Sequence, residues 1–180
     1  MKTFQDLQEG VYDPNILKAF FLAGGPGSGK SYVVKRGTGG LGLKIVNSDD
    51  VLEKYIKDAG LSLKMPKSEE EPRDKLRDKA KAVTKARMGN YVEGRLGLII
   101  DGTGKDYDKI AKQATQLKQL GYDVHMIFVN TSLETALKRN AERERTVPRS
   151  IATKSWKTVQ SNMGKFSQYF RQNFVVVDNN

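Results

Sequence analysis

Five short apolar runs are spaced along the chain, and each has the pattern of a buried β-strand. They span residues 19–23, 43–46, 96–100, 124–129 and 174–177. They are largely unalternating, which is typical of strands covered on both faces in a parallel sheet. The segments between them have helical periodicity, so strands and helices alternate. This order predicts an α/β fold of three layers, with a parallel sheet of about five strands and helices on both faces.

Two of the predicted helices begin with the pattern of a capping box, in which Ser or Thr is followed three residues later by Glu. The pairs are Ser68 with Glu71 and Thr131 with Glu134. They predict that Ser68 and Thr131 are the N-caps of their helices. Prolines at both ends of residues 66–72 predict a turn that leads into the first of these helices.

Glycine and charge patterns mark the exposed segments. Residues 37–42, which read GTGGLG, predict a flexible loop. Residues 67–81 are dense in charges of both signs, as in a solvated helix face with i,i+4 pairs. A chain of 180 residues has room for one proper core, so residues 1–180 form one domain. Within it we expect an N-terminal extension at 1–15 and a lid at 132–150.

The composition excludes several classes of protein. No apolar run approaches the roughly 20 residues needed to cross a bilayer. The N-terminus has acidic residues and no apolar centre, unlike a secretory signal, so we expect a cytoplasmic protein without membrane contact. The chain has no cysteine and one histidine, which excludes disulfides, thiolate chemistry and a Cys/His zinc site.

The net charge is +10, from 31 Lys and Arg against 21 Asp and Glu. Such a charge attracts polyanions. It fits a nucleic-acid substrate and equally a basic surface that concentrates ATP.

The strongest motif, GGPGSGKS at residues 24–31, directly follows the first strand and matches the P-loop pattern G-x-x-x-x-G-K-[ST]. Its glycines let backbone N–H groups wrap a polyphosphate, and the following helix adds the positive end of its dipole. Lys30 can reach the β- and γ-phosphates, and Ser31 can ligate magnesium. The motif predicts a nucleotide site for ATP and Mg²⁺ at Gly25, Pro26, Gly27, Ser28, Gly29, Lys30, Ser31 and Tyr32.

Two acidic elements follow later strands. The sequence NSDD, residues 47–50, ends the second strand, so Asp49 can face the γ-phosphate across the acceptor site and accept the proton of an attacking hydroxyl. Alternatively, Ser48 or Asp49 simply caps the next helix. After the third strand, Asp101 can hold magnesium through water or bind the acceptor together with Thr103; a plain strand-end turn is the other interpretation.

Three arginines lie within residues 137–145. Arg139 and Arg143 are four residues apart, which predicts that they share one helix face. Arginines that close over the γ-phosphate contribute roughly 10³- to 10⁵-fold in rate. We expect Arg139 and Arg143 to bind the phosphates ahead of Arg145, although a solvated helix paired with nearby glutamates fits the same pattern.

Together these motifs resemble the branch of P-loop kinases that contains the zeta toxins and the viral polynucleotide 5′-kinases, over residues 19–178. The resemblance rests on residues 24–31, 47–50 and 101–103, on Arg139-Asn140 with Arg143, and on Val147-Pro148. It implies that Asp49 is the general base and that Arg139 and Arg143 are lid arginines. Residues 101–103 and 117–124 look more like the zeta branch, which implies that Asp101 and Thr103 hold the acceptor.

One position departs from the polynucleotide kinases, which place an arginine shortly after the paired aspartates to grip the acceptor's 3′-phosphate. Here residues 51–54 read VLEK, so only Lys54 could take that role. We expect transfer of the γ-phosphoryl group to a hydroxyl on a nucleic acid or nucleotide. The alternatives are a zeta-type kinase of a nucleotide sugar or other small molecule, and a nucleic-acid-stimulated ATPase. The oligomeric state is open.

Two features attract attention without predicting a site. His125 lies inside a predicted strand, so we expect a structural or surface role. Trp156 begins an apolar stripe at helical spacing, which predicts a face docked on the sheet rather than a base-stacking platform. The stripe continues through Val159, Met163, Phe166 and Phe170.

Overall fold

The computed structural model describes residues 13, 15–37, 41–64, 66–143 and 145–180. Most of the predicted N-terminal extension, and residues 38–40 of the predicted glycine-rich loop, lie outside these residues. The five predicted strands are confirmed and form one parallel sheet. They are β1 (Lys18–Ala23), β2 (Lys44–Val46), β3 (Leu98–Asp101), β4 (Asp123–Asn130) and β5 (Phe174–Asp178).

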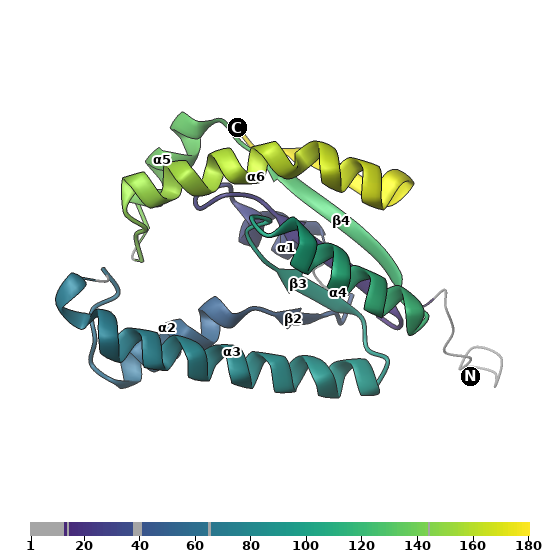
Figure 1. Cartoon of the computed structure of the whole chain (residues 1–180), viewed down its shortest axis with the longest axis horizontal. Helices are drawn as coiled ribbons and strands as arrows, with labels where there is room; N and C mark the ends of the chain where they lie inside the picture. The colour runs from purple at the N-terminus through teal and green to yellow at the C-terminus, as the bar shows by residue number, and fades with distance from the viewer. Residues whose placement is uncertain (1–12, 14, 38–40, 65, 144) are drawn as a thin grey trace, which may run out of the picture.

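Helices connect the strands and cover both faces of the sheet (Figure 1). They are α1 (Lys30–Gly37), α2 (Ser48–Asp58), α3 (Glu70–Glu93), α4 (Tyr107–Gln119), α5 (Leu133–Ala141) and α6 (Arg149–Phe170), with short 3-10 helices η2 (Lys67–Glu69) and η3 (Arg171–Asn173). In the part of the chain that the structure describes, no helix has the length and apolar character to span a bilayer.

The strand order is β2-β3-β1-β4-β5, so the first strand of the chain lies at the centre of the sheet. In the register, Phe21 of β1 pairs with Ile100 of β3 on one side and Met126 of β4 on the other. Because all strands are parallel, their carboxyl ends share one edge. The segments that follow β1, β2 and β3 therefore converge there.

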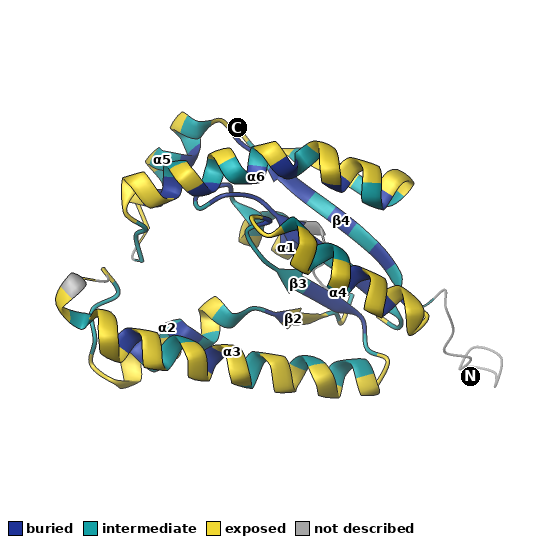
Figure 2. Ribbon diagram, viewed as in Figure 1, coloured by how far each residue is buried: buried dark blue, intermediate teal, exposed yellow. Residues whose placement is uncertain are grey.

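Alternate side chains of β1 supply two separate cores. Phe21 faces α4 and α6 in the larger core, with Leu117 and Phe166. Leu22 points to the opposite face and packs with Val34 of α1. Figure 2 shows the buried positions running along the sheet and along the inner sides of these helices. Burial on both faces explains why the strand sequences do not alternate.

Both predicted capping boxes are wrong. Ser68 lies in η2, and α3 begins two residues later without a side-chain cap. At α5 the cap is Ser132, whose hydroxyl accepts the N–H of Thr135 at 3.2 Å. Thr131 is buried, and its hydroxyl instead donates to the carbonyl of Ser28 at 3.1 Å. Tertiary contact with the glycine loop therefore shifts the cap by one residue.

Two element boundaries also differ from the predicted ones. The third strand begins at Leu98 rather than Leu96, because Leu96 forms an isolated antiparallel bridge with Ile16. Pro72 lies inside the first turn of α3 rather than ahead of it, where its missing N–H costs no helical hydrogen bond. The predicted charge pairs on this helix are confirmed, for example Lys75 with Glu71 at 2.9 Å.

Candidate active site

The glycine-rich loop joins β1 to α1 at the centre of the sheet edge. Gly27 and Gly29 have φ angles of +82° and +84°, a conformation that side chains with a Cβ rarely adopt. A Cβ on Gly27 would also collide with the carbonyl of Ala136 in α5. The loop backbone is thus packed against α5 and shaped as a phosphate cradle requires.

Lys30, the first residue of α1, is half-buried and turns its side chain back toward this loop. Its ammonium donates to the carbonyl of Gly24 at 2.6 Å and to that of Gly25 at 3.5 Å. Burial lowers the pKa of Lys30, and the nearby carboxylate of Asp101 opposes that shift. The loop's own carbonyl groups hold the cation close to the cradle.

The side chain of Asn47 connects the carboxyl ends of β2 and β3. Its amide nitrogen donates to Asp101 at 3.0 Å and to Asp50 at 3.1 Å, and its oxygen accepts the N–H of Asp49 at 2.8 Å. Asn47 is therefore the N-cap of α2, so the alternative that Ser48 or Asp49 is the cap is wrong. Burial raises the pKa of both Asp50 and Asp101, and the positive charge of Lys30 opposes the shift at Asp101.

Asp49 and Arg145 form an ion pair across the site, with Oδ1 and Nη2 separated by 3.0 Å. The Asp49 side chain is 63% exposed, whereas that of Arg145 is 16% exposed. Arg145 was ranked below Arg139 and Arg143 on sequence, yet it is the arginine in contact with the predicted base.

Arg139 and Arg143 do not share a helix face, contrary to the sequence expectation. Helix α5 ends at Ala141, so Arg143 lies in the segment beyond it. Arg143 lines the cavity that contains Lys30. Arg139 is not among the described residues that line it; its guanidinium donates to the carbonyl of Asn179 at 2.6 Å, near the glycine loop.

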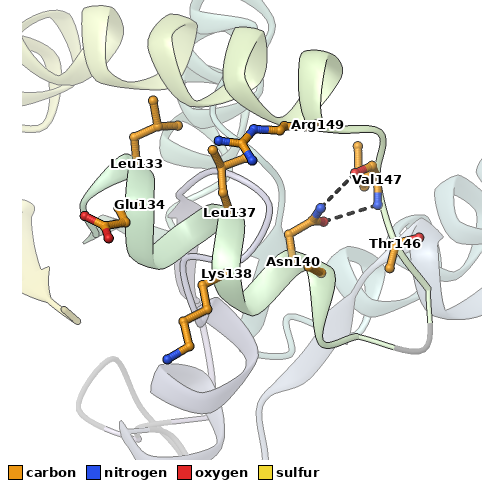
Figure 3. Close-up of a pocket in the computed structure, with 9 residues that line it drawn as sticks. Leu133, Glu134, Leu137, Lys138, Asn140, Thr146, Val147 and Arg149 are labelled. Carbon is orange, nitrogen blue, oxygen red and sulfur yellow. Dashed lines mark hydrogen bonds between the residues drawn. The ribbon is translucent and has the colours of Figure 1, made fainter.

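Asn140, between these arginines, fixes the segment that follows α5. Its amide donates to the carbonyl of Val147 at 2.7 Å and accepts the N–H of Val147 at 3.2 Å (Figure 3). This paired contact ties Val147 to α5, within the predicted lid at 132–150. Asn140 entered the sequence reasoning only as part of a motif, because a buried amide that closes a loop has no local signature.

A cavity of about 230 Å³ lies where these elements meet. Among the described residues its charged lining is evenly mixed, with four carboxylates and four cations. The lining residues include Pro26, Ser31, Thr103, Asp49, Asp50, Glu53, Asp101, Lys30, Lys105, Arg143 and Arg145. Of the predicted residues, Pro26, Lys30, Ser31, Asp49, Asp101, Thr103 and Arg143 come together here. The other predicted residues are not among the described lining residues: Gly25, Gly27, Ser28, Gly29, Tyr32 and Arg139.

Tyr32 lies on the outer side of α1. Tyr32 is exposed, and its hydroxyl accepts a hydrogen bond from Arg36 at 2.6 Å. Only its backbone N–H contacts the loop, at the carbonyl of Gly29. Thr103 contacts the loop in a similar way, because its carbonyl accepts the N–H of Gly24 at 3.0 Å.

The oxygen atoms available for a cation fit magnesium. Ser31 and Asp101 line the same cavity, and hydroxyl and carboxylate oxygens are ligands that Mg²⁺ prefers. Among the described residues there is no group of three or more His, Cys, Asp or Glu able to hold a metal. These two residues would therefore hold the ion together with phosphate oxygens and water, as in other phosphoryl-transfer sites.

Ser155 of α6 was missed by the sequence reasoning. It is 2% exposed, lines the cavity, and its hydroxyl has no hydrogen-bond partner among the described residues. The Nε atom of Arg145 is likewise buried and unpartnered. Buried polar groups without partners are costly, so both atoms are suited to a ligand in this cavity.

The two features set aside on sequence have the expected structural roles. His125 stacks on Phe20 at 5.1 Å and contacts Asp123 at 2.9 Å, in the strand and away from the cavity. Trp156 donates its indole N–H to the carbonyl of Thr131 at 2.8 Å. The rest of the stripe packs in the larger core: Val159, Met163, Phe166 and Phe170.

Solved structures of similar fold come from several kinase-like proteins. The chain of an AvrRxo1-ORF1:-ORF2 complex solved with ATP has a TM-score of 0.70 and 16% identity, covering 91% of this chain and 55% of that one. The PezAT toxin–antitoxin system of Streptococcus pneumoniae gives 0.69 and 17%, covering 90% and 68%. The Pnkp1/Rnl/Hen1 RNA repair complex gives 0.65 and 20%, covering 91% and 49%. These likenesses confirm the P-loop kinase fold.

The chain spans just over half the length of the chains that it matches in the AvrRxo1-ORF1:-ORF2 complexes. Comparison with curated protein sequences gives no match. The profile of one family, Zeta toxin, matches residues 8–180. The chain therefore belongs to the zeta toxin family and has the P-loop kinase fold.

Proposed function

We propose that this protein transfers the γ-phosphoryl group of ATP to a hydroxyl of a small, hydroxyl-rich acceptor, such as the sugar of a nucleotide sugar. The observation that carries the proposal is the acidic lining of the cavity beside Lys30. Asp49, Asp50 and Glu53 line it from α2, and Asp101 from the end of β3. Carboxylates accept hydrogen bonds from hydroxyl groups and repel phosphates, so this wall suits the hydroxyl end of an acceptor.

The arrangement after the paired aspartates supports a small acceptor over a polynucleotide end. Glu53 lines the cavity, whereas Lys54, the residue considered for a terminal phosphate, is exposed and is not among its described lining residues. Glu53 is also paired with Lys57 at 3.0 Å. A carboxylate at this position disfavours an acceptor that carries a phosphate next to the reacting hydroxyl.

The proposed roles follow from position and charge. Asp49 accepts the proton of the acceptor's hydroxyl. The hydroxyl oxygen bonds to the γ-phosphorus as the bond between that phosphorus and the leaving ADP oxygen breaks. Lys30 and Arg143 stabilise the negative charge on the γ-oxygens. Ser31 and Asp101 hold Mg²⁺, which supplies neutralising charge to the phosphates when bound. Arg139, which donates to the carbonyl of Asn179 beside the glycine loop, would bind the nucleotide phosphates from there.

A polynucleotide 5′-hydroxyl is the second candidate acceptor. It is favoured by the net charge of +10 and by the similarity in fold to the Pnkp1/Rnl/Hen1 complex. Salt separates the two candidates, because binding of a polynucleotide weakens steeply with salt and binding of a small nucleotide weakens slightly.

The proposal is tested by incubating the protein with γ-labelled ATP, Mg²⁺ and a panel of candidate acceptors. The panel contains UDP-sugars, free sugars, nucleosides and a 5′-hydroxyl oligonucleotide. We expect label on a small acceptor, lost in Lys30→Ala and in Asp49→Asn. Label on the oligonucleotide alone would replace the proposed acceptor with the second candidate. Label only as free phosphate, stimulated by DNA or RNA, would indicate an ATPase and overturn the transfer reaction.

A further inference from the structure

A second cavity, of about 440 Å³, lies between α3 and α4 and shares Asp101 with the active-site cavity. Four lysines line it. Lys81 and Lys85 come from α3, and Lys109 and Lys112 come from α4. The only carboxylate among its described lining residues is Asp101, at the end nearest the active site. We call this cavity the lysine groove.

The two helices direct their lysines toward the groove because of their spacing. Lys81 and Lys85 are four residues apart, and Lys109 and Lys112 are three apart, so each pair lies on one face of its helix. Both helices pack on the same face of the sheet, where Met88 and Ala114 belong to one core (Figure 1). The two lysine pairs therefore line the same groove from opposite sides.

Among the described residues, one of the four lysines of the groove forms an ion pair and three do not. Lys81 pairs with Asp78 at 3.2 Å. For Lys85, Lys109 and Lys112, the described part of the chain offers no ion pair to the side chain. Like charges gathered around one groove repel one another, and a bound anion would relieve that repulsion.

The floor of the groove is apolar and is held by a contact between the helices. Val46 and Ile100 of the sheet line it, and Gln113 of α4 donates to the sulfur of Met88 in α3 at 3.1 Å. Lysines around an apolar floor suit a ligand that combines phosphate groups with an apolar or ring-shaped part.

We propose that the lysine groove binds the phosphate groups of the acceptor while the acceptor's hydroxyl lies among the carboxylates of the active-site cavity, which shares Asp101 with the groove. This inference rests on the proposed transfer to a small acceptor, and it assigns that acceptor a phosphate or diphosphate separated from the reacting hydroxyl. Lys85, Lys109 and Lys112 are the residues that recognise it. The active-site cavity and the lysine groove then bind the two ends of one molecule.

Binding to the whole protein tests the groove, with the nucleotide site first saturated with Mg²⁺ and a non-hydrolysable ATP analogue. The probes are inorganic pyrophosphate, UDP and a 5′-hydroxyl oligonucleotide, titrated by calorimetry. In the double variant Lys85→Gln with Lys112→Gln, we expect the Kd for pyrophosphate and UDP to rise about tenfold or more. Lys75→Ala, which removes a lysine of α3 outside the groove, should leave both Kd values unchanged. Lys85→Arg with Lys112→Arg should retain binding.

An unchanged Kd in the double Gln variant, with its thermal unfolding unaltered, would overturn the groove as a phosphate site. Binding of the oligonucleotide that depends on these lysines, without binding of UDP, would assign the groove to polynucleotide phosphates and overturn the small acceptor. The two proposals can fail separately. UDP binding that depends on these lysines, without any phosphoryl transfer, would support the groove as a phosphate site and overturn the proposed function. Transfer to a phosphate-bearing acceptor whose KM is unchanged in the double Gln variant would support the proposed function and overturn the groove as its phosphate site.

Discussion

Arg145 and Asp49 are 96 residues apart in the chain, yet their side chains meet at 3.0 Å across the active-site cavity. This contact joins the segment after α5, which follows β4, to the start of α2, which follows β2, across the central strand β1. The carboxylate proposed as general base is therefore oriented by an arginine before any acceptor enters. The guanidinium fixes the position of one carboxylate oxygen of Asp49 at the edge of the cavity.

The role of Asp49 as base predicts the effect of Asp49→Asn. Transfer to the acceptor should fall by about 10²- to 10⁴-fold, because an amide cannot take the proton. Binding of an ATP analogue should persist, since Asp49 lies on the acceptor side of the cavity. Radiolabel transfer and analogue titration measure the two effects. Undiminished transfer in this variant, alongside lost nucleotide binding in Lys30→Ala, would falsify the assignment.

The different surroundings of Arg139 and Arg143 predict different kinetic defects. Arg143 lines the cavity with Lys30, so Arg143→Ala should lower kcat by roughly 10³-fold. Arg139 contacts Asn179 beside the glycine loop, so Arg139→Ala should chiefly raise the KM for ATP. Steady-state kinetics at varied ATP separates these outcomes. Identical defects in both variants would show that the two arginines act as one unit.

Asn47 combines two roles that substitution can separate. Asn47→Ala removes the cap of α2 and should lower the free energy of unfolding by about 1 kcal/mol. Asn47→Ser keeps a capping oxygen and should be nearly as stable as the parent. Both variants lose the amide that holds Asp101, so both should lose activity, by up to about 100-fold. Urea unfolding and transfer assays test this pair; a fully active Ser variant contradicts it.

The position of Gly27 predicts that Gly27→Ala lowers the free energy of unfolding through a packing clash as well as through its backbone conformation. Gly27 and Gly60 have φ angles of +82° and +67°. An added Cβ at Gly60 meets nothing within 4 Å, whereas at Gly27 it meets the carbonyl of Ala136. Gly60→Ala should cost about 1 kcal/mol in the free energy of unfolding, and Gly27→Ala clearly more. Equal losses in chemical denaturation would mean that α5 moves aside at no cost.

The lowered pKa of Asp123 predicts that this residue contributes to the loss of stability at acid pH. Burial favours its neutral form, but hydrogen bonds with His125 and Lys18 outweigh burial and lower the pKa of Asp123. A carboxyl whose pKa is lower in the folded state stabilises the fold above its ordinary pKa, and this contribution disappears as pH falls through the folded value. Asp123→Asn should therefore lower Tm near neutral pH and show a shallower fall between roughly pH 5 and pH 2. Parallel melting curves for the two proteins would contradict this.

The sequence by itself determined the order of strands and helices, the α/β class and the nucleotide loop. Those features have local causes: apolar runs need burial on both faces, and the P-loop pattern needs glycines and lysine at fixed spacing. Asp49 and Asp101 were also predictable, because a residue that directly follows a parallel strand must lie at the common carboxyl edge.

The tertiary structure alone decided which of these residues meet. The cap at Ser132 instead of Thr131 depends on a hydroxyl bond to the loop 103 residues away. Arg145 reaches Asp49 only because α5 ends at Ala141 and the segment beyond it turns back toward α2. The lysine groove likewise forms only when α3 and α4 pack on one face of the sheet. Such contacts depend on the path of the chain between elements, which residue spacing within one element does not encode.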